Sequence, residues 1–200
     1  MKKIAISVVV FLCLSGNAFS ETLQFGIVAS GDVVVANVEV QSRQTYGILA
    51  GGGGISFANG DYTIGEAMVA LRSDRLLPGL RYGLGFKGYY GSVDEEGGNY
   101  DGIFAALGFM VDVDYELTSA FNPVEVPIEA YVGLCYAPSP LVLEDTEQYQ
   151  EYKGGLRFYL LESAFISVEC KYRKFNFKDT DHGEWDRDDT IVTAGLTLRL

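Results

Sequence analysis

The amino-acid sequence predicts an all-β protein: a closed, antiparallel, up-and-down transmembrane β-barrel of 8 to 10 strands. Three observations predict this fold class. Apolar residues recur at every second position in nearly every segment, and the apolar face of each segment is about as long as a strand that crosses a bilayer. The connections between segments alternate between short and long. A chain of 200 residues is long enough for one such barrel.

The first twenty residues have the pattern of a secretory signal peptide. Basic Lys2-Lys3 is followed by an apolar run over residues 4–14 and by the small-residue exit Ala18-Phe19-Ser20. The apolar run of about 11 residues is too short for a membrane-spanning helix, which needs roughly 20. We therefore expect residues 1–20 to be a cleaved signal peptide. Residues 21–200 are then one exported domain, located in the outer membrane of a Gram-negative cell.

The exported domain is strongly acidic. The full sequence has 27 Asp and Glu against 15 Lys and Arg, a net charge of −12, and losing Lys2 and Lys3 lowers this charge to −14. Because nucleic-acid binding needs a basic patch, we expect no nucleic-acid partner. Two cysteines remain, Cys135 and Cys170. The strand pattern places them on opposite faces of separate strands, so we expect two free thiols.

The alternation is plainest in the last predicted strand. Val192, Ala194, Leu196, Leu198 and Leu200 alternate with Thr193, Gly195, Thr197 and Arg199. A strand of this kind at the end of the chain is typical of the signal that outer-membrane barrels present to their assembly machinery, although that signal usually ends in an aromatic residue. We therefore expect this machinery to be a partner.

The same alternation runs through the earlier segments. The strands are expected at residues 23–30, 33–41, 46–57, 62–72, 80–91, 102–116, 125–136, 149–160 and 165–176. Each apolar face runs for about five or six positions, which suits the roughly 9 to 11 residues of a tilted strand in lipid. We expect these faces to contact outer-membrane lipids and lipopolysaccharide.

The opposite faces carry charges of both signs, which a closed barrel can pair across its lumen. The residues expected in this pairing are Glu66, Glu129 and Glu169 with Arg72, Arg81, Lys87, Lys153, Arg157, Lys171, Arg173 and Arg199.

The connections predict an up-and-down order. Short connections are expected at 42–45, 73–79, 117–124 and 161–164, and long polar ones at 92–101, 137–148 and 177–189, with a tight turn at Asn59-Gly60. Outer-membrane barrels have longer loops outside the cell, so the long set is expected there. The pattern allows ten strands, or eight preceded by a loose hairpin at 23–41. Alternation of Val34, Ala36, Val38 and Val40 favours ten.

Aromatic residues cluster near the predicted strand ends, where interfacial girdles form in membrane barrels. The alternative is that they reflect β-propensity alone. The residues concerned are Tyr46, Tyr62, Tyr89, Tyr90, Tyr115, Tyr136, Tyr149, Phe165 and Phe175.

A family resemblance rests on four short motifs. They are Gly85-Phe86-Lys87-Gly88-Tyr89-Tyr90, Cys135-Tyr136-Ala137-Pro138-Ser139-Pro140-Leu141, Tyr149-Gln150-Glu151-Tyr152 and Lys171-Tyr172-Arg173-Lys174. With these motifs the chain resembles the YfaZ family of outer-membrane proteins. The resemblance implies a signal peptide and a β-barrel, and it carries over no catalytic residues.

The acidic segment 179–189 holds His182, the one histidine of the chain. Its carboxylates have the chemistry to bind a divalent cation such as Ca²⁺, but their spacing does not match an EF-hand. The other interpretation is a solvated acidic loop. We expect no metal site and no cofactor.

Three classes of function remain open. A structural or surface-interaction role would use the acidic loops, which contain Asp94, Glu144, Asp145 and the carboxylates of 179–189. The alternative is a narrow ion-conducting or porin-like channel, since a barrel of this size leaves little room inside. The least favoured is a lipid A-modifying enzyme or protease, in which Ser139 or Ser167, or Asp186 with Asp188, would act with His182. We expect no catalytic residues and a monomer.

Overall fold

The computed structural model describes residues 22–44, 47–58, 61–94, 101–117, 126–179 and 183–200. The predicted signal peptide, residues 1–20, lies outside the described residues. The elements are β1 (Thr22–Ala29), β2 (Val33–Gln44), β3 (Gly47–Ala58), β4 (Tyr62–Leu77), β5 (Leu80–Asp94), β6 (Asp101–Glu116), β7 (Ile128–Ala137), the 3₁₀ turn η2 (Ser139–Leu141), β8 (Val142–Glu144), β9 (Thr146–Leu161), β10 (Ala164–Asp179) and β11 (Gly183–Arg199). Among these described elements, none is a helix long and apolar enough to cross a membrane.

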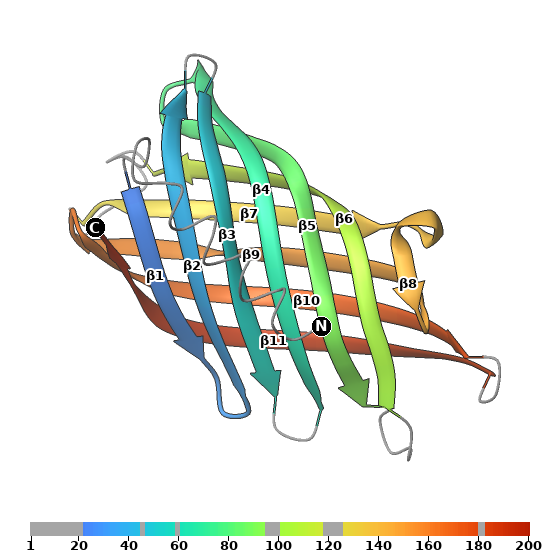
Figure 1. Ribbon diagram of the computed structural model, residues 1–200. Coiled ribbons are helices and arrows are strands. Elements are labelled where there is room, and N and C mark those ends of the chain that lie inside the picture. The colour runs from blue at the N-terminus through green and yellow to red at the C-terminus, as the bar shows by residue number, and fades with distance from the viewer. Residues whose placement is uncertain (1–21, 45–46, 59–60, 95–100, 118–125, 180–182) are drawn as a thin grey trace.

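Ten of the eleven strands form a closed antiparallel barrel (Figure 1). Strands adjacent in the ring pair antiparallel, β5 pairs with β6, and β1 pairs with β11 to close the ring. Leu23 and Leu200 exchange backbone hydrogen bonds of 2.9 and 2.7 Å at this closure. The prediction of ten strands is confirmed, because β1 and β2 are full members of the barrel and not a loose hairpin. Their connection is tight, with Ser30 N donating to Val33 O at 2.8 Å.

The short strand β8 lies outside the ring order. It pairs with β6 through Ala106 and Val142, beyond the point where β7 ends. The next two side chains after β8 complete the β6 edge: Ile103 N donates to Asp145 Oδ2 at 3.0 Å, and Ala105 N donates to Thr146 Oγ1 at 3.2 Å. The segment predicted as a long polar loop at 137–148 is therefore mostly ordered structure that extends the barrel wall.

The two faces of the strands follow the predicted alternation. On β11, Val192 is 59% exposed and points outward, whereas Thr193 is 5% exposed and points inward. On β7, Val132 is exposed and Tyr131 is buried. Over this part of the strands, the apolar residues thus cover the outside of the barrel and the charged residues line its inside, as the sequence predicts.

Along the longer strands, the apolar and the polar residues exchange faces. On β10 the outward residues are apolar up to Tyr172 and then become Lys174 and Lys178. The inward residues change in the opposite sense, from Lys171 and Arg173 to Phe175, which is fully buried. Strand β11 shows the same exchange, because its outer face is acidic in the part of the strand that precedes Val192. One end of the barrel thus has an apolar outside and a polar inside, and the other end has the reverse.

The two rims differ accordingly. The chain-end rim is the one at which β1 begins and β11 ends, and the distal rim is the one at which β10 ends and β11 begins. The predicted long loop 177–189 is wrong for most of its length, because β10 and β11 pair as far as Asp179 and Gly183. The loops predicted at 73–79 and 92–101 are likewise shortened, since β4 reaches Leu77 and β5 reaches Asp94.

Candidate functional site: the barrel lumen

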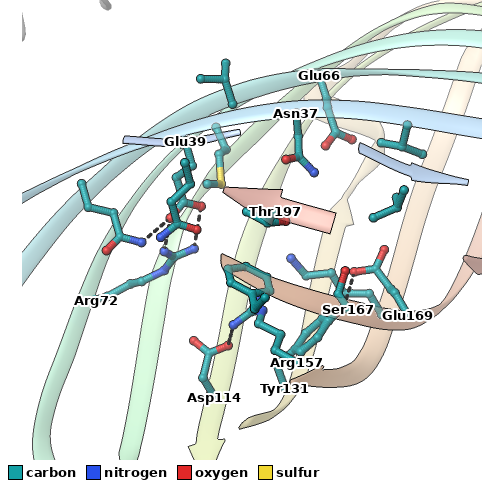
Figure 2. A pocket seen from close by; sticks show the side chains of 18 of the residues that line it. Asn37, Glu39, Glu66, Arg72, Asp114, Tyr131, Arg157, Ser167, Glu169 and Thr197 are labelled. Carbon is teal, nitrogen blue, oxygen red and sulfur yellow. Dashed lines mark hydrogen bonds and ion pairs between the residues drawn. The ribbon is translucent and has the colours of Figure 1, made fainter. Parts of the chain in front are cut away.

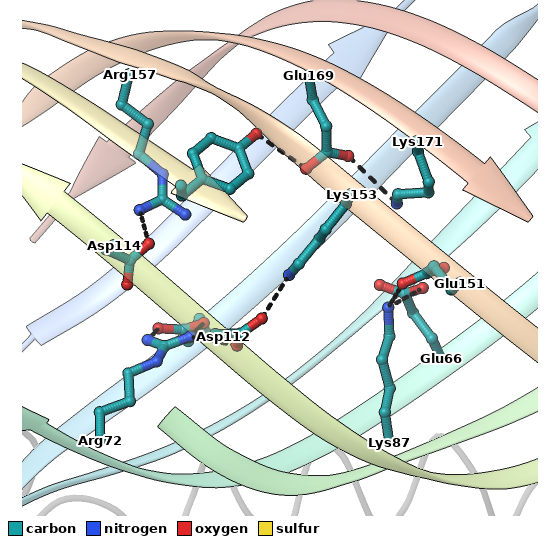
Figure 3. Close-up of polar contacts among 12 residues, drawn as sticks. Glu66, Arg72, Lys87, Asp112, Asp114, Glu151, Lys153, Arg157, Glu169 and Lys171 are labelled. Atoms are coloured by element: carbon teal, nitrogen blue, oxygen red, sulfur yellow. Dashed lines mark hydrogen bonds and ion pairs between the residues drawn. The ribbon is translucent and has the colours of Figure 1, made fainter. Parts of the chain in front are cut away.

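Ion pairs join inward-facing side chains inside the barrel, most of them on the same strand or on strands one or two places apart in the wall (Figure 3). The residues predicted to pair across the lumen do form ion pairs inside the barrel, with the exception of Arg199 among the described residues, but most of these pairs run along the wall and do not cross the lumen. The pairs in the chain-end half are Arg72 with Glu39 (Nη2 to Oε2, 3.1 Å), Lys153 with Asp112 (3.3 Å), Arg157 with Asp114 (2.9 Å) and with Glu129, Arg81 with Glu129, and Lys171 with Glu169 (3.3 Å). The acids Glu39, Asp112 and Asp114 were missing from the predicted set, although the alternation places each of them on an inward face.

A second group of charges lies deeper in the lumen. Lys87 Nζ is 3.0 Å from Glu66 Oε2 and 2.9 Å from Glu151 Oε1. Arg173 Nε donates to Glu151 Oε2 at 3.1 Å. Its Nη2 donates at 3.2 Å to the Oγ of Ser56, which lies on the opposite side of the barrel. We call Glu66, Lys87, Glu151 and Arg173 the buried quartet. Glu151 belongs to the predicted strand 149–160 but was not named among the paired charges, and it is 2% exposed inside the barrel.

The quartet is neutral as a whole, which is the condition for holding four charges away from water. A buried charge without a partner is strongly destabilising, whereas a buried pair with good hydrogen bonds is tolerated. Two carboxylates face two cations here, and Tyr149 Oη donates a further hydrogen bond to Glu151 Oε2 at 2.9 Å. The quartet therefore depends on all four of its members.

Aromatic side chains fill the lumen between the quartet and the distal rim. Phe104, Tyr149, Phe175 and Phe177 are at most 1% exposed. Ring centroids are 4.8 Å apart for Phe104 and Tyr149, 5.1 Å for Phe104 and Phe175, and 4.1 Å for Phe177 and Trp185. Aliphatic side chains from the remaining wall, such as Val33, Ile64, Val93 and Ile191, pack against them. We call this cluster the aromatic plug.

The plug corrects the prediction of aromatic girdles. Tyr62, Tyr89, Tyr149 and Phe175 belong to the plug, and Phe165 is also buried inside the barrel. The outward position is confirmed for Tyr90, at 63% exposure, and Tyr136, at 40%, and Tyr115 is partly exposed. Tyr46 lies outside the described residues. Sequence position near a strand end did not distinguish inward from outward aromatics, but the parity of each position within its strand does.

Arg187 ties the plug to the distal rim. Its guanidinium lies 3.0 Å from Asp61 Oδ1 and 3.1 Å from Asp189 Oδ1, and it donates to the backbone O of Asp94 at 2.7 Å. These partners belong to β11, to the end of β5 and to the connection before β4. The contact therefore fastens β11 to the opposite side of the barrel mouth.

The other half of the lumen is hollow. A cavity of about 180 Å³ lies between the quartet and the chain-end rim, and its wall includes Asn37, Glu66, Arg157 and Thr197 (Figure 2). A wider mouth of about 830 Å³ follows at the chain-end rim. Arg81, Tyr159 and Arg199 line both spaces, so the cavity meets the mouth at these residues. The lumen is thus a blind pocket that ends at the quartet and the plug.

The two cysteines are both free, as predicted. Cys135 is buried in the lumen and Cys170 is exposed on the outer face. The sulfurs therefore lie on opposite sides of the barrel wall, where no disulfide can join them.

The structure describes four of the residues considered for catalysis, Ser139, Ser167, Asp186 and Asp188. Ser167 is buried in the cavity wall, whereas Ser139 is exposed in η2. Asp186 is exposed on the outer face of β11, where it pairs with Lys174 at 3.6 Å. His182 lies outside the described residues. Neither Asp186 nor its outward neighbour Asp188 shares a site with Ser167.

The fold and the lumen define the chain as a small, closed antiparallel β-barrel with an apolar exterior and a charged, half-filled interior. No protein-family model matches the sequence, and no curated protein matches it. Among solved structures, the chain is similar to a KdgM porin, with 10% sequence identity, 89% of this chain and 96% of that chain covered, and a TM-score of 0.43. Two substitution variants of a Rh. blastica porin share 8% identity over 92% of this chain and 99% of theirs, with a TM-score of 0.17. The YfaZ resemblance stays a prediction.

Proposed function

We propose that this chain is an outer-membrane β-barrel that does not conduct solutes and that serves a structural or surface-interaction role. The observation that carries the proposal is the aromatic plug, which fills the distal half of the lumen with fully buried side chains. A solute would have to displace this plug and the buried quartet in order to pass.

The outer face supports the location in a membrane. Large apolar side chains stand exposed around the barrel, among them Ile27, Leu49, Val69, Leu84, Phe109, Val132, Leu156, Val168 and Leu196. Soluble monomers rarely expose contiguous apolar patches of more than a few hundred Å². Lipid is the solvent that suits this face, and we infer outer-membrane lipids and lipopolysaccharide as partners. We also propose that the last strand is read by the barrel assembly machinery, and that the YfaZ resemblance reflects kinship.

We infer which end of the barrel faces outside the cell from the point at which the outer face of the strands changes from apolar to charged. Where the outer face becomes charged, on β10 beyond Tyr172 and on β11 before Val192, the wall has left the lipid and stands in water. We propose that this distal end faces outside the cell. Its acidic outer surface, with Glu184, Asp186 and Asp188, is then the surface available to partners.

Conductance in planar lipid bilayers tests the proposal. We expect no steady single-channel steps at high protein density, with folding verified by a heat-dependent shift in gel migration. The double variant Tyr149→Ala with Phe175→Ala removes two rings of the plug and is expected to open steps. The matched control, Phe86→Ala with Phe109→Ala, removes two contacting rings from the outer face, whose centroids are 5.2 Å apart, and should stay silent. Steady steps from the unmodified protein would refute the proposal.

A narrow channel is the second candidate, and the cavity of about 180 Å³ is the observation that favours it. Half of the lumen is already open and polar, so movement of the quartet and the plug would complete a path. We infer no enzymatic activity. Unchanged lipid A profiles and unchanged peptide cleavage after His182→Ala would agree with that inference, and a lost activity would overturn it.

A further inference from the structure

We propose that the distal part of β11 is an open strand edge, to which a basic, extended peptide segment adds itself as a further strand. This inference deepens the surface-interaction role proposed above, and it rests on that proposal for the position of the distal rim outside the cell. It depends on the register of β11 with its two neighbours, on the direction of its backbone groups and on the charge of its outer face.

Strand β11 has two neighbours over only part of its length. Its pairing with β10 continues as far as Gly183, whereas its pairing with β1 stops at Ala194. Within the part of the chain that the structure describes, no other strand pairs with residues 183–193 on the side that β1 leaves. In Figure 1, β10 and β11 extend together past the tip of β1. Residues 183–193 are therefore an edge strand.

The free backbone groups of this edge follow from the direction in which each residue points. Successive residues of a strand direct their N–H and C=O groups alternately to its two sides. Arg199 N donates to Ser163 O on the β10 side, and Leu200 exchanges hydrogen bonds with Leu23 on the β1 side. The register with β10 has no shift, so the even-numbered residues point to the side of β1 throughout. We call the following residues the open edge: Glu184, Asp186, Asp188, Thr190 and Val192.

An edge of this kind belongs in water or beneath another strand. Unpaired backbone groups are not tolerated in the hydrocarbon region of a membrane, which is why sheets that span it are closed. The side chains of Glu184, Asp186 and Asp188 are charged and exposed on the outer face, which agrees with an edge that stands clear of lipid. The open edge is thus accessible to a partner from solution.

The edge is already held in the extended form that a partner strand needs. Its other side is paired with β10 along its whole length. Its inward face is fastened by Arg187, which contacts Asp61 Oδ1 at 3.0 Å and donates to the backbone O of Asp94 at 2.7 Å. A surface that is preorganised in this way adds little ordering cost to binding. Addition of an extended peptide to such an edge gains affinity from main-chain hydrogen bonds and selectivity from alternate side chains.

The outer side chains of the edge select a basic partner. Opposed residues on neighbouring strands have Cβ atoms about 4.5 to 5.5 Å apart, so opposite charges there are stabilising and like charges destabilising. Lys178 and Lys174 contact Glu184 at 2.9 Å and Asp186 at 3.6 Å, but from the β10 side, and the two acidic side chains stay 67% and 64% exposed. Exposed pairs of this kind are weak, and an ionised carboxylate accepts several hydrogen bonds. With Asp188, three carboxylates face two lysines, and all three can receive a cation from the open side.

A second copy of the chain is a poor occupant of the same edge. The open edge is centred on Asp188, so a symmetric antiparallel pairing over its whole length would place Asp188 directly opposite the same residue of the other copy. Asp186 of each copy would lie diagonal to it. Like charges in these positions are destabilising, so the acids oppose self-association and favour a basic strand.

The test uses the full barrel in lipid nanodiscs, which leave both rims accessible. The probe is a peptide of about nine residues that alternates lysine with threonine, long enough to span the open edge. We expect saturable binding, with slower amide hydrogen exchange at Asp186, Asp188 and Thr190 when followed by NMR. Asp189 and Ile191 should not change, because their N–H groups already face β10. No saturable binding, or protection without this alternation, would overturn the proposal.

Two control peptides separate strand addition from attraction of charge alone. A peptide that alternates glutamate with threonine should bind at least about tenfold more weakly, because it sets like charges side by side. The lysine peptide with every backbone amide methylated keeps its charge and loses its N–H donors, and it should be weakened by at least about the same factor. Equal binding of either control would contradict the inference.

Two variants of the barrel test the acids. Asp186→Asn with Asp188→Asn removes two charges from the open edge and should weaken binding of the lysine peptide at least about tenfold. The matched control, Glu116→Gln with Glu162→Gln, removes two exposed charges at the chain-end rim and should bind as the unmodified barrel does. The heat-dependent gel shift verifies folding of both.

Charged residues on an edge can also serve only to keep other strands away. In that case the edge variant would bind the peptide more tightly or would self-associate, and either result would overturn the proposal. Conductance in bilayers depends on the plug and not on this edge, so a failure of this inference and a failure of the proposed function are separate results.

Discussion

Arg173 provides the most decisive test of the buried quartet. Its side chain is 1% exposed, and its guanidinium contacts Glu151 at 3.1 Å, Ser56 at 3.2 Å and Glu66 at 3.9 Å. The substitution Arg173→Met keeps an aliphatic stem of similar length and removes the charge. Among the described residues, Lys87 is then the one ion-pair partner that Glu66 and Glu151 keep within 4.0 Å.

The expected cost follows from the burial. Removing one partner of a buried ion pair costs about 3 to 5 kcal/mol, because the other charge stays buried without compensation. We expect this loss in the free energy of unfolding of Arg173→Met. An exposed pair is worth far less, so Lys178→Met, which breaks a pair with Glu184 whose side chains are 61% and 67% exposed, should have no measurable effect.

Equilibrium unfolding in urea, with the barrel in lipid vesicles and tryptophan fluorescence as the probe, measures both variants. A double variant, Arg173→Met with Glu66→Gln, restores a neutral cluster of Lys87 and Glu151. We expect it to be more stable than the sum of the single variants by at least about 1 kcal/mol, within the range of couplings between contacting residues. Additive costs, within about 0.5 kcal/mol, would refute the reasoning that charge balance holds the quartet together.

Three further predictions test the outer face and the plug. Leu196→Arg places a cation in the apolar outer face and should cost about 2 to 4 kcal/mol, whereas Thr190→Arg, beyond the reversal on the same strand, should cost at most about 1 kcal/mol in the same urea assay. A bulky water-soluble maleimide should label neither Cys170 nor Cys135 in vesicles and both after unfolding; rapid labelling of Cys170 would place that face in water. Phe104→Ala empties the centre of the plug and should lower stability by about 3 to 5 kcal/mol, and a loss below 1 kcal/mol would show that the plug is loosely packed.

The sequence was informative about the barrel because a strand with two unlike faces leaves a period of two. This period predicted the inward and outward faces of β7, β10 and β11, and it favoured the ten strands that the structure has. It also placed Lys87, Arg173 and Glu66 inside. The period of two could not predict which charges pair with each other, because a pairing such as Lys87 with Glu151 depends on which strands face each other across the lumen.

The missed features have one physical cause. Segments 92–101 and 177–189 were interpreted as loops because their charged residues interrupt an apolar face. Charge interrupts that face when a strand ends, but also when a strand continues from lipid into water. Lys174 and Asp188 are outward neighbours on paired strands, so the wall persists where its outer face is polar. The girdle prediction failed for the aromatics of the plug for the same reason, since an aromatic such as Phe175 belongs inside where the outer face of the wall is charged.

This reversal also explains why the lumen is closed at one end. In the half that we propose to face lipid, the apolar residues lie on the outside of the wall, so the inside is free to be polar and hollow. In the half that we propose to stand in water, the barrel must form a core of its own, as a soluble β-barrel does, and Phe104, Tyr149 and Phe177 provide it. The plug is thus the hydrophobic core of the projecting half and requires no inserted loop. A substitution that opens the lumen should therefore also destabilise the projecting half, and conductance and stability should change together across a series of plug variants.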